Sequence, residues 1–375
     1  YLANFAEFGI DSPDIHQTVK IAQLTGEIDR QTRMSTMSQT QSRFGIVGCD
    51  LGQSFEHQER VCFLFGDTTT DHNIRRDSSA DLDSIGFTSD IDASKCIRVD
   101  FDRSYPRVNG IDQRGFCVPP AGISMGPTQM YVFFTTDHRG DGSFGDTMGR
   151  SVLARSSDGG LTFGSPLYDL SLDKFINMSL QLVNHDSYPG LPGPQGKGIL
   201  MWGSGSYRRS NVYLAYVPAD QIEDRSAFSF FAGGGPAQPL WSAKESDAVP
   251  VILSGSVGEL CVRWNAVIRR FVLLYNADNP VGILERQAVL PWGPWTGPQN
   301  IFDLGCAFGQ YIHIADGSDG LSDPGKEAQG SGFYGPYMID RYTKPNSDGS
   351  SRVFFVLSVW NPYNTMLMST TIRAR

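Results

Sequence analysis

Basic residues are the minority in this sequence, and long apolar runs are missing. The chain carries 31 Lys and Arg against 40 Asp and Glu, which gives a formal net charge of −9. A balance of this sign argues against a general nucleic-acid binder, which carries a basic face. No apolar run approaches the roughly 18 residues that a membrane-spanning helix needs. We therefore expect neither a nucleic-acid nor a membrane partner, and a neutral or weakly charged ligand is the simpler expectation.

Cysteine is limited to six residues, and none of them form a C-x-x-C pair. This excludes the usual zinc cluster. An even number of cysteines in a chain whose basic residues are mostly Arg favours a secreted protein with up to three disulfides, the alternative being six buried thiols. The first residue, Tyr1, is compatible with a removed leader segment. From chain order alone we predict three pairs: Cys49–Cys62, Cys96–Cys117 and Cys261–Cys306.

Helical patterns are rare, whereas turn-forming residues are abundant. The chain contains 41 Gly and 21 Pro, and aromatic residues make up 11% of it. This composition favours many short strands joined by tight turns. The only short helix we expect spans Pro218–Ser226, with Pro at its first turn.

Five similar apolar segments recur along the chain. Each has a polar residue, about five apolar residues and then small or polar ones, and the starts lie 69, 68, 72 and 83 residues apart. They are too short for helices and apolar on both faces, as strands buried between packed sheets are. The segments are Arg60–Thr68, Gln129–Asp137, Lys197–Gly205, Arg269–Ala277 and Arg352–Trp360.

Further strands flank these segments. Candidate following strands are Ser151–Arg155, Asn211–Tyr216, Gly282–Arg286 and Thr365–Thr370, and candidate preceding strands are Phe44–Leu51 and Gly258–Asn265. Radial repetition of small antiparallel sheets is the propeller solution to exposed sheet edges. We therefore predict an all-β, five-bladed β-propeller that forms a single domain over residues 1–375. Residues 44–375 form the blades, and residues 1–43 form an arm whose segment Gln17–Glu27 adds a strand to the last blade.

One turn motif supports a propeller. Residues Ser156–Phe163 match the Asp-box pattern S-x-D-x-G-x-T-F/W. Its Ser and Asp side chains bond the backbone of a tight hairpin, and its Gly permits positive φ. We interpret the motif as a structural turn and not as a site of chemistry.

The strongest candidates for chemistry are Asp50 and Asp67. Both lie near the ends of two successive expected strands of the first blade, in the segments FGIVGCDLG and FLFGDTT. Two carboxylates near a propeller axis can hydrolyse a glycosidic bond, one as the acid and the other as base or nucleophile. The plainer interpretation is that both are turn residues.

The order of several motifs resembles that of the endo-D-arabinanase family of glycoside hydrolases, over about residues 44 to 370. The motifs are the D-L-G and L-F-G-D-T pair at 50–52 and 64–68, followed by Asp83–Asp90, Gly258–Asn265, Arg270–Asn276, Phe333–Tyr337 and Val356–Asn364. The resemblance implies a five-bladed propeller that cleaves α-linked arabinofuranose polymers, with Asp50 and Asp67 as the catalytic pair. The segment Gly317–Gly330 and the cysteine content depart from the family pattern.

Other polar and aromatic residues are candidates for substrate binding, in addition to Asp83. Glu259 and Arg263 share a strand face, because side chains alternate with period two, and they form either a sugar-binding pair or a structural ion pair between blades. Amide and aromatic groups near loop ends can bond or stack on sugars, although most aromatics must be core. The remaining candidates are Asn276, His313, Tyr334, Trp360 and Asn361.

We expect a secreted monomer that acts on a polysaccharide or oligosaccharide without a cofactor. The loop with Asp316, Asp319 and Asp323 could hold a structural Ca²⁺, although solvated turn residues explain it as well. Two other functions remain open. One is a polysaccharide lyase on a propeller, with His138 beside Arg139, or His313, or a Tyr as the base. The other is a glycan-binding propeller without catalysis.

Overall fold

The computed structural model describes residues 18–70, 82–102, 105–139, 148–205, 208–303, 305, 307, 309–314, 316–321 and 329–375. The fold is all-β, as predicted: strands dominate, and α1 (Thr40–Phe44) is one short turn of helix. No helix in the described ranges has both the length and the apolar character needed to cross a membrane.

Two four-stranded antiparallel sheets form the N-terminal part of the fold. Their strands are apolar on both faces because neighbouring sheets cover them; in β3, for example, six consecutive residues from Val61 to Gly66 are buried. The first sheet contains β2 (Ile46–His57), β3 (Arg60–Thr70), β4 (Leu82–Thr88) and β5 (Asp100–Phe101). The second contains β6 (Ala121–Ser124), β7 (Met130–Thr136), β8 (Arg150–Ser156) and β9 (Tyr168–Ser171).

The middle of the chain forms a nine-stranded sheet made of two antiparallel sets. The two sets are joined where β12 pairs with β15 at Ser210–Val257 and Val212–Ile252. The first set contains β10 (Asn177–Asn184), β11 (Lys197–Ser204), β12 (Ser210–Pro218), β13 (Ser229–Gly235) and β14 (Gln238–Ser242). The second contains β15 (Ile252–Asn265), β16 (Arg270–Asp278), β17 (Val281–Ala288) and β18 (Gln299–Phe302).

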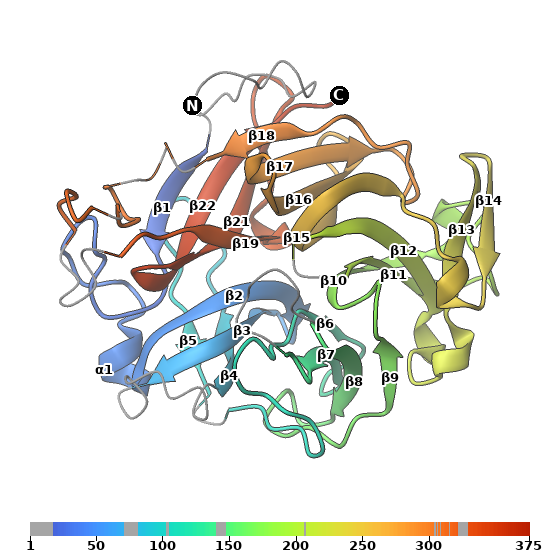
Figure 1. Ribbon diagram of the computed structural model, residues 1–375, viewed down its shortest axis with the longest axis horizontal. Coiled ribbons are helices and arrows are strands. Elements are labelled where there is room, and N and C mark those ends of the chain that lie inside the picture. The colour runs from blue at the N-terminus through green and yellow to red at the C-terminus, as the bar shows by residue number, and fades with distance from the viewer. Residues whose placement is uncertain are drawn as a thin grey trace.

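The last sheet combines both ends of the described chain. The expected N-terminal strand is β1 (Val19–Gln23), which pairs antiparallel with β22. Figure 1 shows β1 beside the C-terminal strands. The other strands of this sheet are β19 (Phe333–Met338), β20 (Lys344–Pro345), β21 (Ser351–Trp360) and β22 (Tyr363–Ile372).

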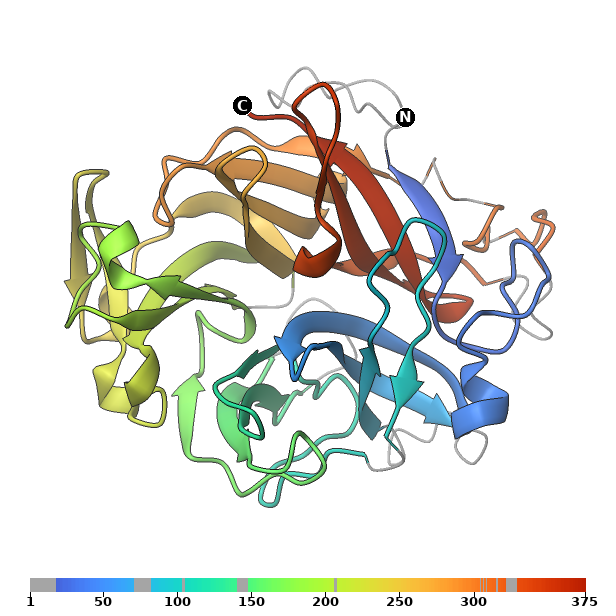
Figure 2. The same cartoon turned by 180° about the vertical axis from the view of Figure 1, so that it is seen from behind.

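The sheets are arranged around a common centre. The innermost strands contact one another in a closed circuit that runs β2, β6, β10, β15, β19 and back to β2. Figures 1 and 2 show these strands at the middle of the molecule, with the later strands of each set farther out. This arrangement brings side chains from every part of the described chain to one central region.

The five recurring segments form strands β3, β7, β11, β16 and β21, as predicted. The short helix expected over Pro218–Ser226 does not form. Two separate 3₁₀ turns, η3 (Ala219–Gln221) and η4 (Arg225–Ala227), replace it. The Asp158 carboxylate in the Asp-box turn accepts hydrogen bonds from the backbone N–H (2.9 Å) and hydroxyl (2.6 Å) of Thr162.

The predicted disulfides are wrong for the described cysteines. Cys49, Cys62, Cys96, Cys117 and Cys261 are free thiols, and Cys306 lies outside the described residues. Cys62 is opposite Phe55 in the β2–β3 pairing. Cys49 is six residues before Phe55, about 20 Å away at the usual strand rise, so the two sulfurs are far beyond bonding distance. Burial raises the pKa of Cys96 and of Cys117 to about 11.

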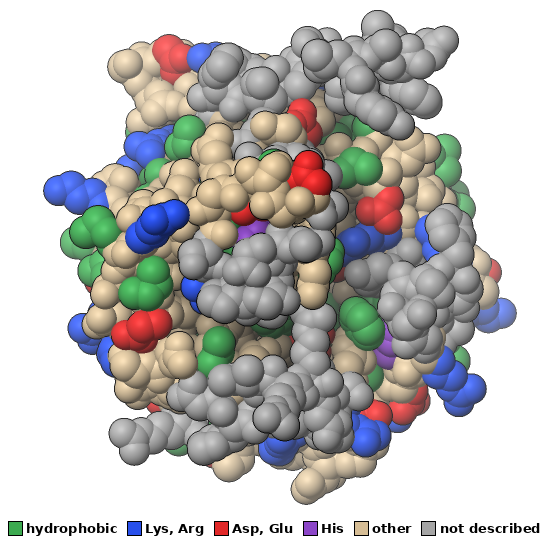
Figure 3. Space-filling model, turned by 60° about the vertical axis from the view of Figure 1, so that its left-hand side comes forward, with side chains coloured by type: hydrophobic (Ala, Val, Ile, Leu, Met, Phe, Trp, Pro, Cys, Tyr) green, Lys and Arg blue, Asp and Glu red, His purple; other side chains and the backbone are tan. Residues whose placement is uncertain are grey.

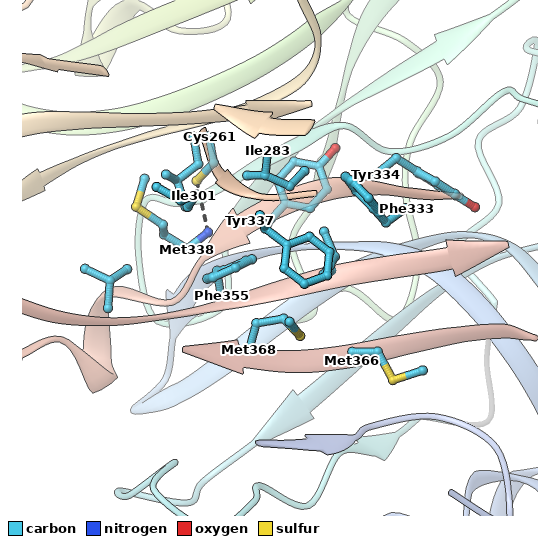
Figure 4. Close-up of a cluster of buried hydrophobic side chains, with 14 of the residues drawn as sticks. Cys261, Ile283, Ile301, Phe333, Tyr334, Tyr337, Met338, Phe355, Met366 and Met368 are labelled. Atoms are coloured by element: carbon cyan, nitrogen blue, oxygen red, sulfur yellow. Dashed lines mark hydrogen bonds between the residues drawn. The ribbon is translucent and has the colours of Figure 1, made fainter. Parts of the chain in front are cut away.

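A large apolar cluster lies between the C-terminal strands and the β15–β18 set. Figure 4 shows part of it, where the Met338 backbone N–H donates to Sγ of Cys261 (3.3 Å). Tyr334 lies at the edge of this cluster, with its hydroxyl directed away from it. On the face in Figure 3, acidic and basic side chains are interspersed.

Candidate functional site

Asp50 and Asp67 lie on paired strands at a point where the pairing is irregular. Asp50 is opposite Gly66, whereas Gly48 is opposite Thr69, so β3 has an extra residue in this stretch. A second register shift occurs between Phe65 and Thr68 where β3 pairs with β4. Asp67 therefore occupies a β-bulge, a feature that re-aims side chains and is frequent beside active sites.

The backbone around both aspartates is strained. Asp67 has φ of 39° and Leu51 has φ of 60°, which is unfavourable for residues with a Cβ, and Gly52 has φ of 89°. Strained backbone of this kind is concentrated at functional sites. Gly66 is required by space, because a Cβ there would lie 2.4 Å from Val118 Cγ1 and 3.2 Å from Asp50 Oδ1.

Two tyrosines of the C-terminal sheet contact this pair of aspartates. The Tyr334 hydroxyl donates to Oδ2 of Asp50 (2.7 Å), and the Tyr363 hydroxyl donates to the Asp67 backbone carbonyl (3.0 Å). Burial raises the pKa of Tyr363 well above its ordinary value, and the charges of Asp50 and Asp67 raise it further. The phenol of Tyr363 therefore lies within electrostatic reach of both carboxylates. Asp50 is buried and Asp67 half-buried.

Asp83 on β4 is buried and does not lie at the surface. Its side chain is 1% exposed, and Oδ2 accepts a hydrogen bond from the Gln113 amide (2.6 Å). Burial raises the pKa of this carboxyl well above its ordinary value, and the negative charge of Asp50 adds to the shift. Asp83 is placed to influence Asp50, but at this exposure a saccharide in solution does not reach it.

Glu259 lies at a register shift in β15 and meets an arginine that the sequence analysis missed. Arg208 Nε is 3.6 Å from Oε2 of Glu259, and its guanidinium lies 5.5 Å from the centre of the Tyr334 ring. Gly258 leaves room for both neighbours, because a Cβ there would lie 2.6 Å from the Asn276 amide and 2.8 Å from Arg208 Cγ. Arg208 has φ of 50° and lies in a loop, so neither periodicity nor a motif marks it.

Arg263 lies apart from Glu259 and holds strands together. Its guanidinium donates to the backbone carbonyls of Ser54 (2.8 Å) and Leu180 (3.1 Å), and its Nε is 3.3 Å from Asp340 Oδ2. The arginine beside Glu259 is therefore Arg208, and the shared strand face expected for Glu259 and Arg263 does not bring those two side chains into a pair. Positions four residues apart on a strand lie about 13 Å apart, so a shared face does not by itself bring them into contact.

His313 and Asn361 form a second buried group. His313 Nδ1 is 3.1 Å from both carboxylate oxygens of Asp319, and its backbone N–H donates to the Asn361 carbonyl (3.2 Å). The Asn361 amide donates to the Gln329 carbonyl (2.8 Å), and the neighbouring Trp360 is 37% exposed. Hydrogen bonds thus tie the ring of His313 to its own loop and join that loop to the end of β21.

The acidic loop considered for Ca²⁺ shows no metal site in the part that the structure describes. Asp316 and Asp319 accept backbone hydrogen bonds within their own loop, and Asp323 lies outside the described residues. Within the described ranges, no group of three or more His, Cys, Asp and Glu is placed to hold a metal ion.

The predicted site residues thus fall into three groups. Asp50, Asp67, Asp83 and Tyr334 come together around the β2–β3 bulges, and Glu259 and Asn276 join them through Arg208. His313, Trp360 and Asn361 belong to the neighbouring loop region, where Trp360 pairs with Tyr363. The guanidinium of Arg263 on β15 donates hydrogen bonds to backbone carbonyls of β2 and β10 and so links these strands.

These features define an all-β protein whose antiparallel sheets surround a centre lined by carboxylates, tyrosines and an arginine. The chain belongs to the family described as "Domain of unknown function (DUF4185)", whose model matches residues 35–369. A search of the curated proteins found no match.

Several solved structures are similar to this chain at low sequence identity. One, described as "Glycoside hydrolase", is 9% identical, with 96% of this chain and 94% of the other covered and a TM-score of 0.46. An endo-1,4-β-xylanase from Bacteroides thetaiotaomicron is 12% identical over 85% of this chain and 90% of its own length, with a TM-score of 0.43. A β-xylosidase/α-arabinofuranosidase from a compost metagenome is 9% identical over 88% and 92%, with a TM-score of 0.44.

Proposed function

We propose that this protein is a glycoside hydrolase that cleaves α-linked arabinofuranose polymers, with Asp50 and Asp67 as the catalytic pair on a five-bladed β-propeller. The observation that carries the proposal is the pairing of β2 with β3, which places Asp50 opposite Gly66 and directly beside the bulged Asp67. Two carboxylates from adjacent positions supply the acid and the base or nucleophile of glycoside hydrolysis. The motif order described above selects arabinan as the substrate.

The surroundings of the two carboxylates suit different roles. Asp50 is buried and held by the Tyr334 hydroxyl, whereas Asp67 is half-buried on a strained bulge. An acid and a base that act at one pH need unequal environments, and these two carboxylates differ in burial and in hydrogen bonding. Because Asp50 is fixed by a hydrogen bond from another sheet, its orientation is set before substrate binds.

The Arg208–Glu259 pair lies near the ring of Tyr334, which holds Asp50, and would contribute to substrate binding from there. Oδ1 of Asn276 and Oε2 of Glu259 are buried without a hydrogen bond among the described residues, although Oε2 also forms the 3.6 Å ion pair with Arg208. Buried polar atoms without a partner are costly, so a ligand hydroxyl that satisfies them gains affinity. A furanose polymer offers such hydroxyls and carries no charge. It therefore suits a group in which the guanidinium of Arg208 and the carboxylate of Glu259 balance each other.

The test is hydrolysis of a panel of plant, fungal and mycobacterial polysaccharides with product analysis. Arabinan is expected to release oligosaccharides, and Asp50→Asn and Asp67→Asn are each expected to lower kcat by about 10³-fold or more, as the loss of an essential catalytic group does. Asp224→Asn is the matched control, because Asp224 is an exposed carboxylate that caps the turn at Ser226 (2.8 Å). Circular dichroism checks that all three variants fold.

The competing functions give different results in the same assay. Products that absorb in the ultraviolet would identify a lyase, because elimination leaves a new C=C bond. Saturable binding without product over long incubation would identify a glycan-binding protein. Turnover close to that of the wild type in either catalytic variant would remove that aspartate from the mechanism.

A further inference from the structure

Two aromatic side chains stand out because they are exposed. Among the large hydrophobic residues exposed in the described part of the chain, Phe116 at 38% and Trp360 at 37% are the aromatic ones. Aromatic rings bury a large area when they pack, so an exposed ring forgoes that stabilisation. Each is linked to the Asp67 bulge through a neighbouring residue, Val118 for Phe116 and Tyr363 for Trp360.

Phe116 lies on the segment that leads into β6. Val118, two residues later, contacts the position where a Cβ of Gly66 would be (2.4 Å), next to Asp67. Phe116 has φ of 60°, a genuine outlier for a bulky residue. Its ring lies 5.1 Å from the ring of His138, so the exposed face is supported from one side. A strained, supported and exposed ring is typical of a binding surface and not of a core residue.

Trp360 approaches Asp67 from the C-terminal sheet. It ends β21 and is paired with Tyr363, whose hydroxyl donates to the Asp67 backbone carbonyl (3.0 Å). The Tyr363 backbone is also close to β2, because a Cβ on Gly48 would lie 2.1 Å from the Tyr363 carbonyl oxygen. The indole lies over Gly332, 3.2 Å from the position of a Cβ there, so a side chain at 332 would displace it.

The two rings belong to different sides of the first sheet. Strand β2 contacts β21 and β22 on the side of Trp360 and β6 on the side of Phe116. Figure 1 shows the β2–β4 strands between the C-terminal sheet and the β6–β9 sheet. The first sheet, which carries Asp67, therefore lies between the segments that carry the two rings.

We propose that Phe116 and Trp360 are stacking surfaces for two sugar residues of one polysaccharide, on either side of Asp67. This inference rests on the proposed function and adds the residues that bind the substrate. The ligand is a neutral oligosaccharide of several residues whose C–H faces cover the two rings. Apolar and aromatic walls with few polar groups are typical of small-ligand sites. Because the two rings come from sheets on either side of the first sheet, and packed sheets lie about 10 Å apart, a ligand that covers both must be longer than a disaccharide.

The experiment measures calorimetric binding of arabinofuranose oligosaccharides of two, four and eight residues to the Asp67→Asn protein. We expect Phe116→Ala and Trp360→Ala each to weaken octasaccharide binding by roughly tenfold, which is a loss of about 1.4 kcal/mol, with a much smaller effect on the disaccharide. Phe116→Tyr and Trp360→Phe keep an aromatic face and are expected to restore most of the affinity. Leu172→Ala is the control, because Leu172 is a 76% exposed apolar residue in the segment between β9 and β10.

The outcomes separate this inference from the proposed function. If the wild type cleaves arabinan but both alanine variants bind the octasaccharide as tightly as the parent, the stacking surfaces are disproved and the hydrolase proposal stands. If the wild type neither binds nor cleaves any arabinofuranose oligomer, the proposed function fails and this inference with it. An equal loss of affinity for disaccharide and octasaccharide would also contradict the arrangement, because it would place both rings at one sugar residue.

Discussion

The hydroxyl of Tyr334 donates a 2.7 Å hydrogen bond to the carboxylate of Asp50, and the two residues are 284 positions apart in the sequence. This bond joins β19 in the C-terminal sheet to β2 in the N-terminal one. A hydrogen bond to a charged acceptor is stronger than one between neutral groups, so it fixes both the carboxylate and the relation between the sheets. The site therefore depends on the correct closure of the ring of sheets.

Tyr334→Phe is expected to lower arabinan hydrolysis while leaving the fold intact. The substitution removes the hydroxyl and keeps the ring in its cluster. Hydrogen bonds to charged groups contribute about 1.5–3 kcal/mol, which corresponds to about 10- to 160-fold. Steady-state kinetics should show the loss mainly in kcat, because the carboxylate orientation is affected and not the substrate contacts. An unchanged kcat would mean that this bond only supports the structure.

Gly66→Ala is expected to destabilise the protein and to reduce hydrolysis. The new Cβ would lie 2.4 Å from Val118 Cγ1, and overpacking of this kind costs about 1–3 kcal/mol. The free energy of unfolding in urea measures the first effect. Gly126→Ala is the matched control, because its nearest neighbour would be Gln129 Cβ at 3.8 Å. Equal stabilities of the two variants would show that the segment at Val118 moves aside freely.

Asp83→Asn is expected to remove a pH dependence of stability. Burial raises the pKa of Asp83 well above its ordinary value of 3.8, so between that value and the higher folded pKa the folded state holds a proton that the unfolded state has lost. Wild-type stability therefore falls as pH rises through this interval, and the variant lacks this term. The melting temperature of the variant relative to the wild type should rise from pH 4 to pH 8. A constant difference would contradict the assignment.

Asp158→Asn is expected to weaken the Asp-box turn without changing hydrolysis. Burial opposes ionisation of Asp158, but hydrogen bonds from Thr162 and Ser156 outweigh it and hold the pKa of Asp158 below its ordinary value. The ionised carboxylate therefore stabilises the turn above pH 4, and this contribution is lost as pH falls. We expect a melting temperature lower by roughly 1–3 °C at pH 7 and a smaller difference at pH 3. A large loss of activity would instead connect this turn to the site.

The strands and the turn motif could be predicted because their signals are local. The apolar segments Arg60–Thr68 and Lys197–Gly205 have the length and burial pattern of strands, and β3 and β11 form there. The Asp box is a single run of eight residues whose side chains bond their own backbone. The helix expected at Pro218–Ser226 does not form, and two separate 3₁₀ turns, η3 and η4, lie in this stretch instead.

The site was only partly accessible from the sequence. Asp50 and Asp67 are marked by their motifs. No local signal marks Arg208, whose neighbour Tyr334 is more than a hundred residues away in the chain. No local signal marks Phe116 either, which is distinguished by its strained φ. The Glu259–Arg263 pairing failed because residues four apart on a strand are separated by about 13 Å even when they share a face. Disulfide pairing failed because chain order does not set the distance between thiols.

The sequence by itself determined where the strands lie, because hydrophobic periodicity and turn chemistry act over a few residues. It indicated that Asp50 and Asp67 lie near strand ends, whereas both lie within the paired strands β2 and β3. Only the tertiary structure decided that Tyr334 reaches Asp50 and that Arg208 reaches Glu259. These relations depend on β-bulges and on closure of the ring between distant segments. Both are set by the packing of whole sheets and not by any short stretch of residues.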